Sequence, residues 1–215
     1  MTLLYQDRKE AGQTLALALR AFRNRKDAIV LGLPRGGVPV ACQVAEALHL
    51  PLDIFLVRKL GLPGHEELAM GALAQGNGIV FNTDVLDTYS PGNREIERAV
   101  QREQRELQRR EQVYRPGKPP LDVKGRTVIL VDDGLATGAT MRAAVQALRE
   151  QEPAAIVVAV PVGPPDTCQE LELEVDQLIC PRRPANFYAI GQWYEDFGQT
   201  SDEEVRALLN LSGVQ

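Results

Sequence analysis

Two adjacent carboxylates, Asp132 and Asp133, stand directly before a run of small and hydroxylated residues, Gly134 to Thr140. Backbone N–H groups that lead into a helix N-terminus bind anions, and small side chains let a phosphate approach them closely. Two carboxylates would repel that phosphate unless they face a sugar diol or a metal ion. Because carboxylates only accept hydrogen bonds, an adjacent pair suits two neighbouring ribose hydroxyls. The stretch therefore predicts a site for a phosphorylated sugar.

The residues on either side of this stretch predict the elements that position it. Val128 to Val131 is a run of branched apolar residues, which is typical of a strand buried on both faces. From Ala139 to Arg149 the apolar residues recur at helical spacing. The carboxylates would then lie where a buried strand leaves its sheet, and the small residues would form the loop before a helix.

A second loop of similar kind occurs earlier in the chain. Pro34-Arg35-Gly36-Gly37 separates a predicted strand, residues 28–33, from a predicted helix, residues 38–48. Two glycines beside an arginine can bind an anion, and a glycine-rich turn with a solvated arginine is the alternative. The P-loop pattern G-x-x-x-x-G-K-[ST] does not occur, and residues 32–37 do not match G-x-G-x-x-G.

A pair of cations follows the next predicted strand, residues 52–57. Arg58 and Lys59 precede the glycine- and proline-rich residues 60–64. Open α/β sheets bind their ligands at the ends of strands, so this pair is placed to neutralise an anionic substrate.

The composition indicates an ordinary water-soluble protein of 215 residues, with 44% hydrophobic and 25% charged residues. No apolar run approaches the ~20 residues of a membrane helix, and no signal-peptide core is visible. Three widely spaced cysteines fit a reducing compartment, so we expect a cytoplasmic protein. A net charge of −5 argues against nucleic acid as the main ligand.

The remaining segments predict supporting structure. The residues from Asp7 to Phe22 fit a packing helix with no visible chemistry, and residues 68–81 fit a hairpin. Residues 93–115 are rich in Arg and Glu and fit an exposed helix, in an insertion of about residues 84–120. Such a helix can serve as a lid, as the arm of a homodimer or as a solvated insertion; its single thin apolar stripe favours an amphipathic insertion.

The motif from Asp132 to Thr140, after its apolar strand, resembles the signature of the type I phosphoribosyltransferases. The resemblance implies a Rossmann-like α/β fold, an open parallel sheet flanked by helices, in a single domain over residues 1–215. It also implies a small hood over a nucleobase, at about residues 181–200 here, where Phe187 or Tyr188 could stack on a planar base. Aromatic residues that close an ordinary core are the alternative for this segment.

The resemblance further implies a substrate, a metal and a role for each loop. The substrates would be 5-phosphoribosyl-1-pyrophosphate (PRPP) and a small nitrogenous base, with release of pyrophosphate. Asp132 and Asp133 would hold the ribose diol, directly or through Mg²⁺, as catalytic and metal-binding residues. The 5′-phosphate would be bound by Gly134, Leu135, Ala136, Thr137, Gly138, Ala139 and Thr140. The pyrophosphate would be bound by Arg35, Gly36, Gly37, Arg58 and Lys59.

One departure from the family pattern affects the chemistry. Hypoxanthine-type members carry an acidic residue directly before the loop threonine, and this chain has Ala136 there. The proton-transfer group and the acceptor base are therefore not identified. A regulator that binds PRPP without catalysis is the main alternative function. Half of a pyrophosphokinase is a third, although the chain holds a single copy of the loop.

Overall fold

A computed structural model of the chain describes residues 4–76 and 78–211. The chain divides into two compact units. The first comprises the residues up to Phe55, Val123–Gly138 and the residues from Glu152 onward. The second comprises Leu56–Asp122 and Ala139–Gln151. Each unit is therefore assembled from segments that are far apart in the sequence.

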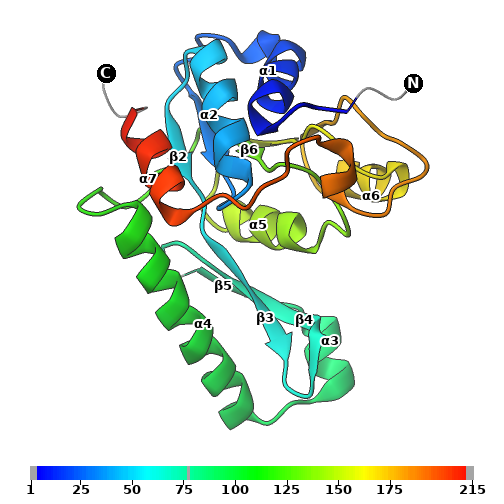
Figure 1. Cartoon of the computed structure of the whole chain (residues 1–215). Coiled ribbons are helices and arrows are strands. Elements are labelled where there is room, and N and C mark those ends of the chain that lie inside the picture. The colour runs from blue at the N-terminus through cyan, green and yellow to red at the C-terminus, as the bar shows by residue number, and fades with distance from the viewer. Residues whose placement is uncertain (1–3, 77, 212–215) are drawn as a thin grey trace. The chain divides into compact units, whose positions relative to one another are not determined.

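The first unit is built on a five-stranded parallel sheet in the order β2-β1-β6-β7-β8 (Figure 1). Its strands are β1 (Ala28–Gly32), β2 (Leu52–Ile54), β6 (Thr127–Val131), β7 (Ala155–Ala159) and β8 (Gln177–Ile179). The register pairs Ala28 with Thr127 and Gly32 with Val131, so β1 and β6 end side by side. The loops that follow these two strands therefore leave the same edge of the sheet.

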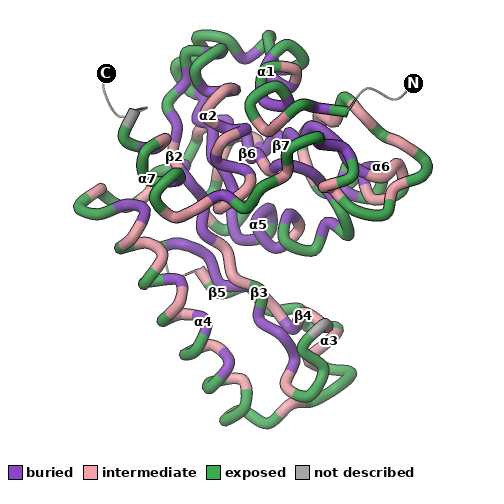
Figure 2. The backbone as a smooth tube through the Cα atoms, in the orientation of Figure 1, coloured by how far each residue is buried: buried purple, intermediate pink, exposed green. Residues whose placement is uncertain are grey.

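Every residue of β1 and of β6 is buried, as the continuous apolar sequence of these strands predicts (Figure 2). The helices of this unit are α1 (Arg8–Ala18), α2 (Gly37–Leu48), α6 (Pro165–Glu172) and α7 (Asp202–Leu211). Helix α2 packs on β1, β2 and β6, while α1 and α7 pack on α2. Two short 3-10 helices, Arg20–Phe22 and Ile190–Trp193, complete the unit.

The second unit is an antiparallel three-stranded sheet with helices packed on it. Its strands are β3 (Val57–Leu62), β4 (His65–Ala74) and β5 (Gly78–Phe81), in the order β3-β4-β5. Its helices are α3 (Thr83–Tyr89), α4 (Asn93–Tyr114) and α5 (Ala139–Arg149). Helix α5 packs on all three strands and α4 packs on β3 and β4.

Helix α4 is the predicted charged helix, and its packing stripe is narrow. The buried residues are Ala99, Glu103, Leu107 and Tyr114, and most of the remaining surface is exposed or half-buried (Figure 2). Glu103 tolerates burial because it accepts hydrogen bonds from Arg58 at 2.6 Å and from Arg102 at 3.0 Å. The stripe therefore includes a buried carboxylate that is neutralised by arginines.

The parallel sheet with flanking helices confirms the predicted fold class, and α5 has the predicted bounds. The predicted strand at residues 52–57 was wrong at its C-terminal end, because β2 stops at Ile54. Arg58 and Lys59 lie inside β3, where they pair with Leu73 and Ala72 of β4. Leu60 to Leu62 complete β3, and Pro63 and Gly64 form the β3–β4 turn, with Gly64 at φ +79°.

No helix within the described part of the chain is both long enough and apolar enough to span a membrane. The predicted insertion at residues 84–120 falls within the second unit and the predicted hood at residues 181–200 falls within the first. The organisation as a single domain remains a prediction.

Candidate functional site

The loops after β1 and β6 meet at the edge of the parallel sheet. The backbone N–H of Leu33 donates to the carbonyl of Val131 at 2.9 Å, which continues the strand pairing into the loops. A Cβ atom on Gly37 would lie 2.7 Å from that same carbonyl oxygen. A Cβ atom on Gly36 would lie 2.1 Å from Oδ2 of Asp133. The two glycines are therefore required for the first loop to lie against the acidic pair.

The two carboxylates of the pair differ in their surroundings. Asp133 is 8% exposed, whereas Asp132 is half-buried and accepts a hydrogen bond from the backbone N–H of Asp133 at 2.8 Å. Burial raises the pKa of Asp132 well above its ordinary value, and the neighbouring Asp133 raises it further. Burial also raises the pKa of Asp133, although Arg8 opposes this shift. A pair of this kind is stabilised by added positive charge or by hydroxyl donors.

Asp133 is held from both sides by residues distant in the sequence. The Arg8 Nε atom, from the first turn of α1, donates to Oδ2 of Asp133 at 2.9 Å. The Tyr194 hydroxyl donates to the backbone carbonyl of Asp133 at 2.6 Å. Burial raises the pKa of Tyr194, and the nearby charge of Asp133 adds to this effect, so the phenol remains a donor. The conformation of the acidic pair is therefore set by α1 and by the segment after Ile190–Trp193.

The loop that begins at Gly134, which the sequence predicts to bind phosphate, is anchored to the same unit at two further points. The backbone N–H of Leu135 donates to the Val162 carbonyl at 2.8 Å, and Thr167 Oγ1 donates to the Ala136 carbonyl at 3.1 Å. A Cβ atom on Gly134 would lie 2.6 Å from Cγ2 of Ile190. The start of the loop is thus covered by the segment that the sequence predicts as a hood.

The two predicted base-stacking residues lie in different environments. Phe187 is half-buried and packs against the cluster of Tyr5, Ala11, Val162, Trp193 and Tyr194, with its ring centroid 6.3 Å from that of Trp193. Tyr188 is 90% exposed. Phe187 thus has a packing role, whereas the ring of Tyr188 is open to solvent.

The other predicted site residues are spread over both units. Ala136 and Thr137 are exposed in the loop, Gly138 is buried with a φ of +76°, and Ala139 and Thr140 open α5. Arg35 forms an ion pair of 3.7 Å with Asp202 at the start of α7. The peptide bond between Pro34 and Arg35 is cis. Arg58 and Lys59 belong to the second unit, where Arg58 is bound to Glu103.

Sequence reasoning missed Arg8 and Tyr194. The sequence shows no visible chemistry in the first helix, and the structure adds a contact there, in which the Arg8 guanidinium donates to a carboxylate of the acidic pair. Arg8 and Tyr194 are separated from Asp133 by 125 and 61 positions in the sequence. No local pattern in a single sequence indicates contacts over such separations. Their proximity could be found only from the fold.

Residues 5–181, which contain both loops and the acidic pair, match the model of the phosphoribosyl transferase domain. The chain therefore belongs to the phosphoribosyl transferase family. The crystal structure of the protein TT1426 from Thermus thermophilus is similar to it, with a TM-score of 0.86, 40% identity and coverage of 96% of this chain and 98% of that one.

Two proteins of Mycobacterium tuberculosis, both named "Putative phosphoribosyl transferase", are each 44% identical over 207 residues, or 96% of this chain. The chain spans 46% of the length of each, about half of these curated relatives.

Proposed function

We propose that this chain binds PRPP at the acidic pair and transfers its ribose 5-phosphate to a nitrogenous base, with release of pyrophosphate. The observation that carries the proposal is the meeting of two glycine-containing loops around Asp132 and Asp133 at one edge of the sheet. Membership of the phosphoribosyl transferase family supports the same substrate. The proposal names the acceptor only by its class, a nitrogenous base.

Each loop has a distinct role in this proposal. The carboxylates accept hydrogen bonds from the ribose hydroxyls, and residues 134–140 bind the 5′-phosphate through backbone N–H groups and hydroxyls. Arg35, Gly36 and Gly37 bind the pyrophosphate, and Arg58 and Lys59 are assigned to it by the family resemblance. Tyr188 rather than Phe187 is the better candidate to stack on the base, because its ring is exposed.

The residues present fit Mg²⁺. The acidic pair offers hard oxygen atoms, and its raised pKa values indicate that the ionised pair would be stabilised by a cation. No group of three or more candidate metal ligands occurs among residues 4–76 and 78–211. Mg²⁺ commonly binds through one or two carboxylates together with waters and substrate phosphates. When bound, it would neutralise the charge that develops on the leaving pyrophosphate.

The proposed reaction depends on how the sugar and the base are positioned, and it needs no covalent intermediate with the protein. The bond from C1 of the ribose to the pyrophosphate oxygen breaks and pyrophosphate keeps the electron pair, while a ring nitrogen of the base bonds to C1 with inversion. The base then releases its ring N–H proton to solvent. In an oxocarbenium-like transition state, rate comes from holding the sugar in line with the base and from stabilising the departing anion. The two loops supply these effects.

Calorimetric titration of PRPP with and without Mg²⁺ tests the proposal directly. We expect binding that depends on Mg²⁺, and its loss in Asp132→Asn/Asp133→Asn. Asp87→Asn, an exposed carboxylate on α3, is the matched control and should bind as the wild type does. No binding by the wild type would overturn the proposal. Binding without pyrophosphate release from any of a panel of bases would favour the regulatory alternative.

A further inference from the structure

The contacts of Asp133 point to a division of roles within the acidic pair. We propose that Arg8 is a positioning residue that holds Asp133 as a structural tie, so that Asp132 alone faces the ribose hydroxyls and a metal ion. The inference rests on the proposed function, since it assigns roles within the PRPP site. It narrows the proposed function and differs from the sequence expectation, since in both of these the two carboxylates act on the substrate.

Arg8 links three parts of the first unit through one guanidinium group. Its Nε atom lies 2.9 Å from Oδ2 of Asp133, and its Nη1 atom donates to the carbonyl of Gly198 at 2.7 Å. Its Cζ atom lies 4.0 Å from the ring centroid of Phe197. The side chain is 13% exposed; its bond to Asp133 is partly buried, whereas its bond to Gly198 lies at the surface. An arginine with a carboxylate, a carbonyl and an aromatic face as partners has a fixed position.

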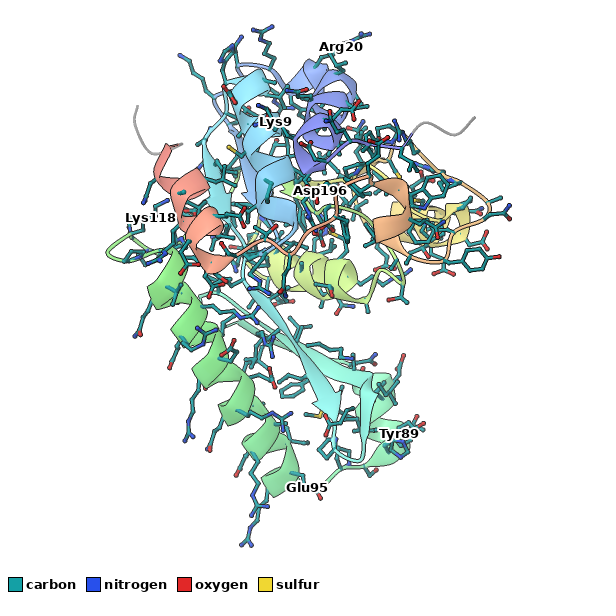
Figure 3. All side chains as sticks on the ribbon, in the orientation of Figure 1. Lys9, Arg20, Tyr89, Glu95, Lys118 and Asp196 are labelled. Carbon is teal, nitrogen blue, oxygen red and sulfur yellow. The ribbon has the colours of Figure 1, made fainter. Side chains whose placement is uncertain are left out.

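The segment that Arg8 reaches is itself attached to the N-terminal residues. The backbone N–H of Glu195 donates to the Tyr5 carbonyl at 2.8 Å, and that of Asp196 donates to the Gln6 carbonyl at 2.9 Å. Figure 3 labels Asp196 on this segment and Lys9 on α1. Arg8 therefore connects the acidic pair to a segment of the predicted hood that is already ordered by backbone pairing.

The Asp133 carboxylate already has a cationic partner. Its Oδ2 atom accepts from Arg8 and lies 2.1 Å from where a Cβ of Gly36 would be, and the residue is 8% exposed. The backbone of Asp133 is fixed separately, by the Tyr194 hydroxyl at its carbonyl and by Asp132 at its N–H. Asp132, in contrast, accepts one local backbone hydrogen bond and is the more exposed of the two. The carboxylate that is available to hydroxyls and to a cation is thus that of Asp132.

The two proposed roles predict opposite behaviour on substitution. Asp132→Asn should weaken Mg²⁺-dependent PRPP binding by about tenfold or more, since even outer-shell partners of a metal have effects of that order, and should not lower Tm. Asp133→Asn should lower Tm and leave the dependence of PRPP binding on Mg²⁺ intact. Arg8→Met should lower Tm because it leaves a buried carboxylate without its partner, and Arg8→Met/Asp133→Asn should recover part of that loss.

The Mg²⁺ dependence separates a positioning role of Arg8 from a merely structural one. In Arg8→Met the freed Asp133 adds a second carboxylate, so half-maximal PRPP binding should need less Mg²⁺. Arg8→Met/Asp133→Asn should return that concentration to the wild-type value. Arg8→Lys, which keeps the charge, should lie close to the wild type, and Lys9→Met on the exposed face of α1 is the control. A purely structural Arg8 would change affinity at every Mg²⁺ concentration and leave the midpoint where it was.

The outcomes distinguish this inference from the proposed function. If the wild type binds PRPP and both single Asn variants lose the Mg²⁺ dependence equally, the division of roles is wrong and the proposed function stands. The same conclusion follows if the Arg8 and Asp133 substitutions have additive effects on Tm. If the wild type does not bind PRPP, the proposed function and the role given to Asp132 are both overturned.

Discussion

Gly134 lies under the side chain of Ile190, and the space between them is too small for a methyl group. A Cβ atom at position 134 would be 2.6 Å from one carbon of Ile190 and 3.0 Å from another. The backbone φ of Gly134 is not in the left-handed region, so this glycine is required by packing and not by backbone conformation. The contact links the phosphate loop to the segment that covers it.

We expect Gly134→Ala to destabilise the protein by about 1–3 kcal/mol, the usual cost of overpacking, and to weaken PRPP binding because the loop must move. Shortening the opposing side chain should relieve the clash, so Gly134→Ala/Ile190→Ala should bind PRPP better than Gly134→Ala alone. Denaturant unfolding and calorimetry measure the two effects. Gly78→Ala is the control, since a Cβ there meets nothing within 4 Å. A Gly134→Ala variant as stable as that control would contradict the packing explanation.

The strand, loop and helix around Asp132 and Asp133 could be predicted from the sequence, because they are encoded in one contiguous motif. The partners of Asp133 could not, because Arg8 and Tyr194 approach it from distant parts of the chain. Arg58 is a further case. Its position beside Lys59 predicted a cation for an anionic substrate, and the fold adds a partner that the sequence did not report, the buried Glu103.

At the level of elements, the sequence predicted the bounds of helices and strands best where periodicity and local turn residues agree. The bounds of α5 and the hairpin of β4 and β5 follow from such patterns. The prediction was poorest where an apolar run continues beyond the end of a strand. The chain leaves β2 at Ile54 and enters a different sheet at Val57, and no residue between them marks the change.

Helix α4 depends on ion pairs along its exposed side, which makes its stability sensitive to pH. Arg109 and Arg110 both donate to Glu106 at 2.8 Å. The hydrogen bond from Arg109, followed by that from Arg110, lowers the pKa of Glu106 from 4.5 to about 2. A carboxyl group whose folded-state pKa is depressed stabilises the fold above the unfolded pKa, and this stabilisation is lost as the pH falls towards the folded value.

We therefore expect Glu106→Gln to be less stable than the wild type at neutral pH by less than about 1 kcal/mol, because the pairs are partly exposed. The difference should narrow as the pH falls from 4.5 towards 2, where the wild-type carboxyl is protonated as well. Urea unfolding of both proteins across this range measures the difference. If the difference in the free energy of unfolding between the two proteins stays constant with pH, Glu106 acts through packing and not through its charge. Glu97→Gln, exposed on the same helix, is the control.

At the scale of the whole molecule, PRPP binding should appear as a gain in thermal stability. A ligand that binds only the folded state at 100 times its Kd stabilises by about 2.7 kcal/mol. For a chain of this size that corresponds to a rise in Tm of roughly 5–11 °C. Scanning calorimetry with Mg²⁺ and PRPP measures the rise, with ribose 5-phosphate and pyrophosphate as separate controls. Equal shifts from pyrophosphate alone would contradict recognition of the sugar.

The anchoring of Asp133 by Arg8 and Tyr194 has a consequence for the time at which the site forms during synthesis. The five-stranded sheet has all its strands once the ribosome has added Ile179. The hydroxyl of Tyr194 and the carbonyl of Gly198 that complete the Asp133 network are added later. A nascent chain can thus pair its strands while Asp133 still lacks the hydrogen bond from Tyr194. Under the proposed function, the ability to hold the sugar should be completed only after emergence of the residues near 198, in a step separate from folding of the sheet.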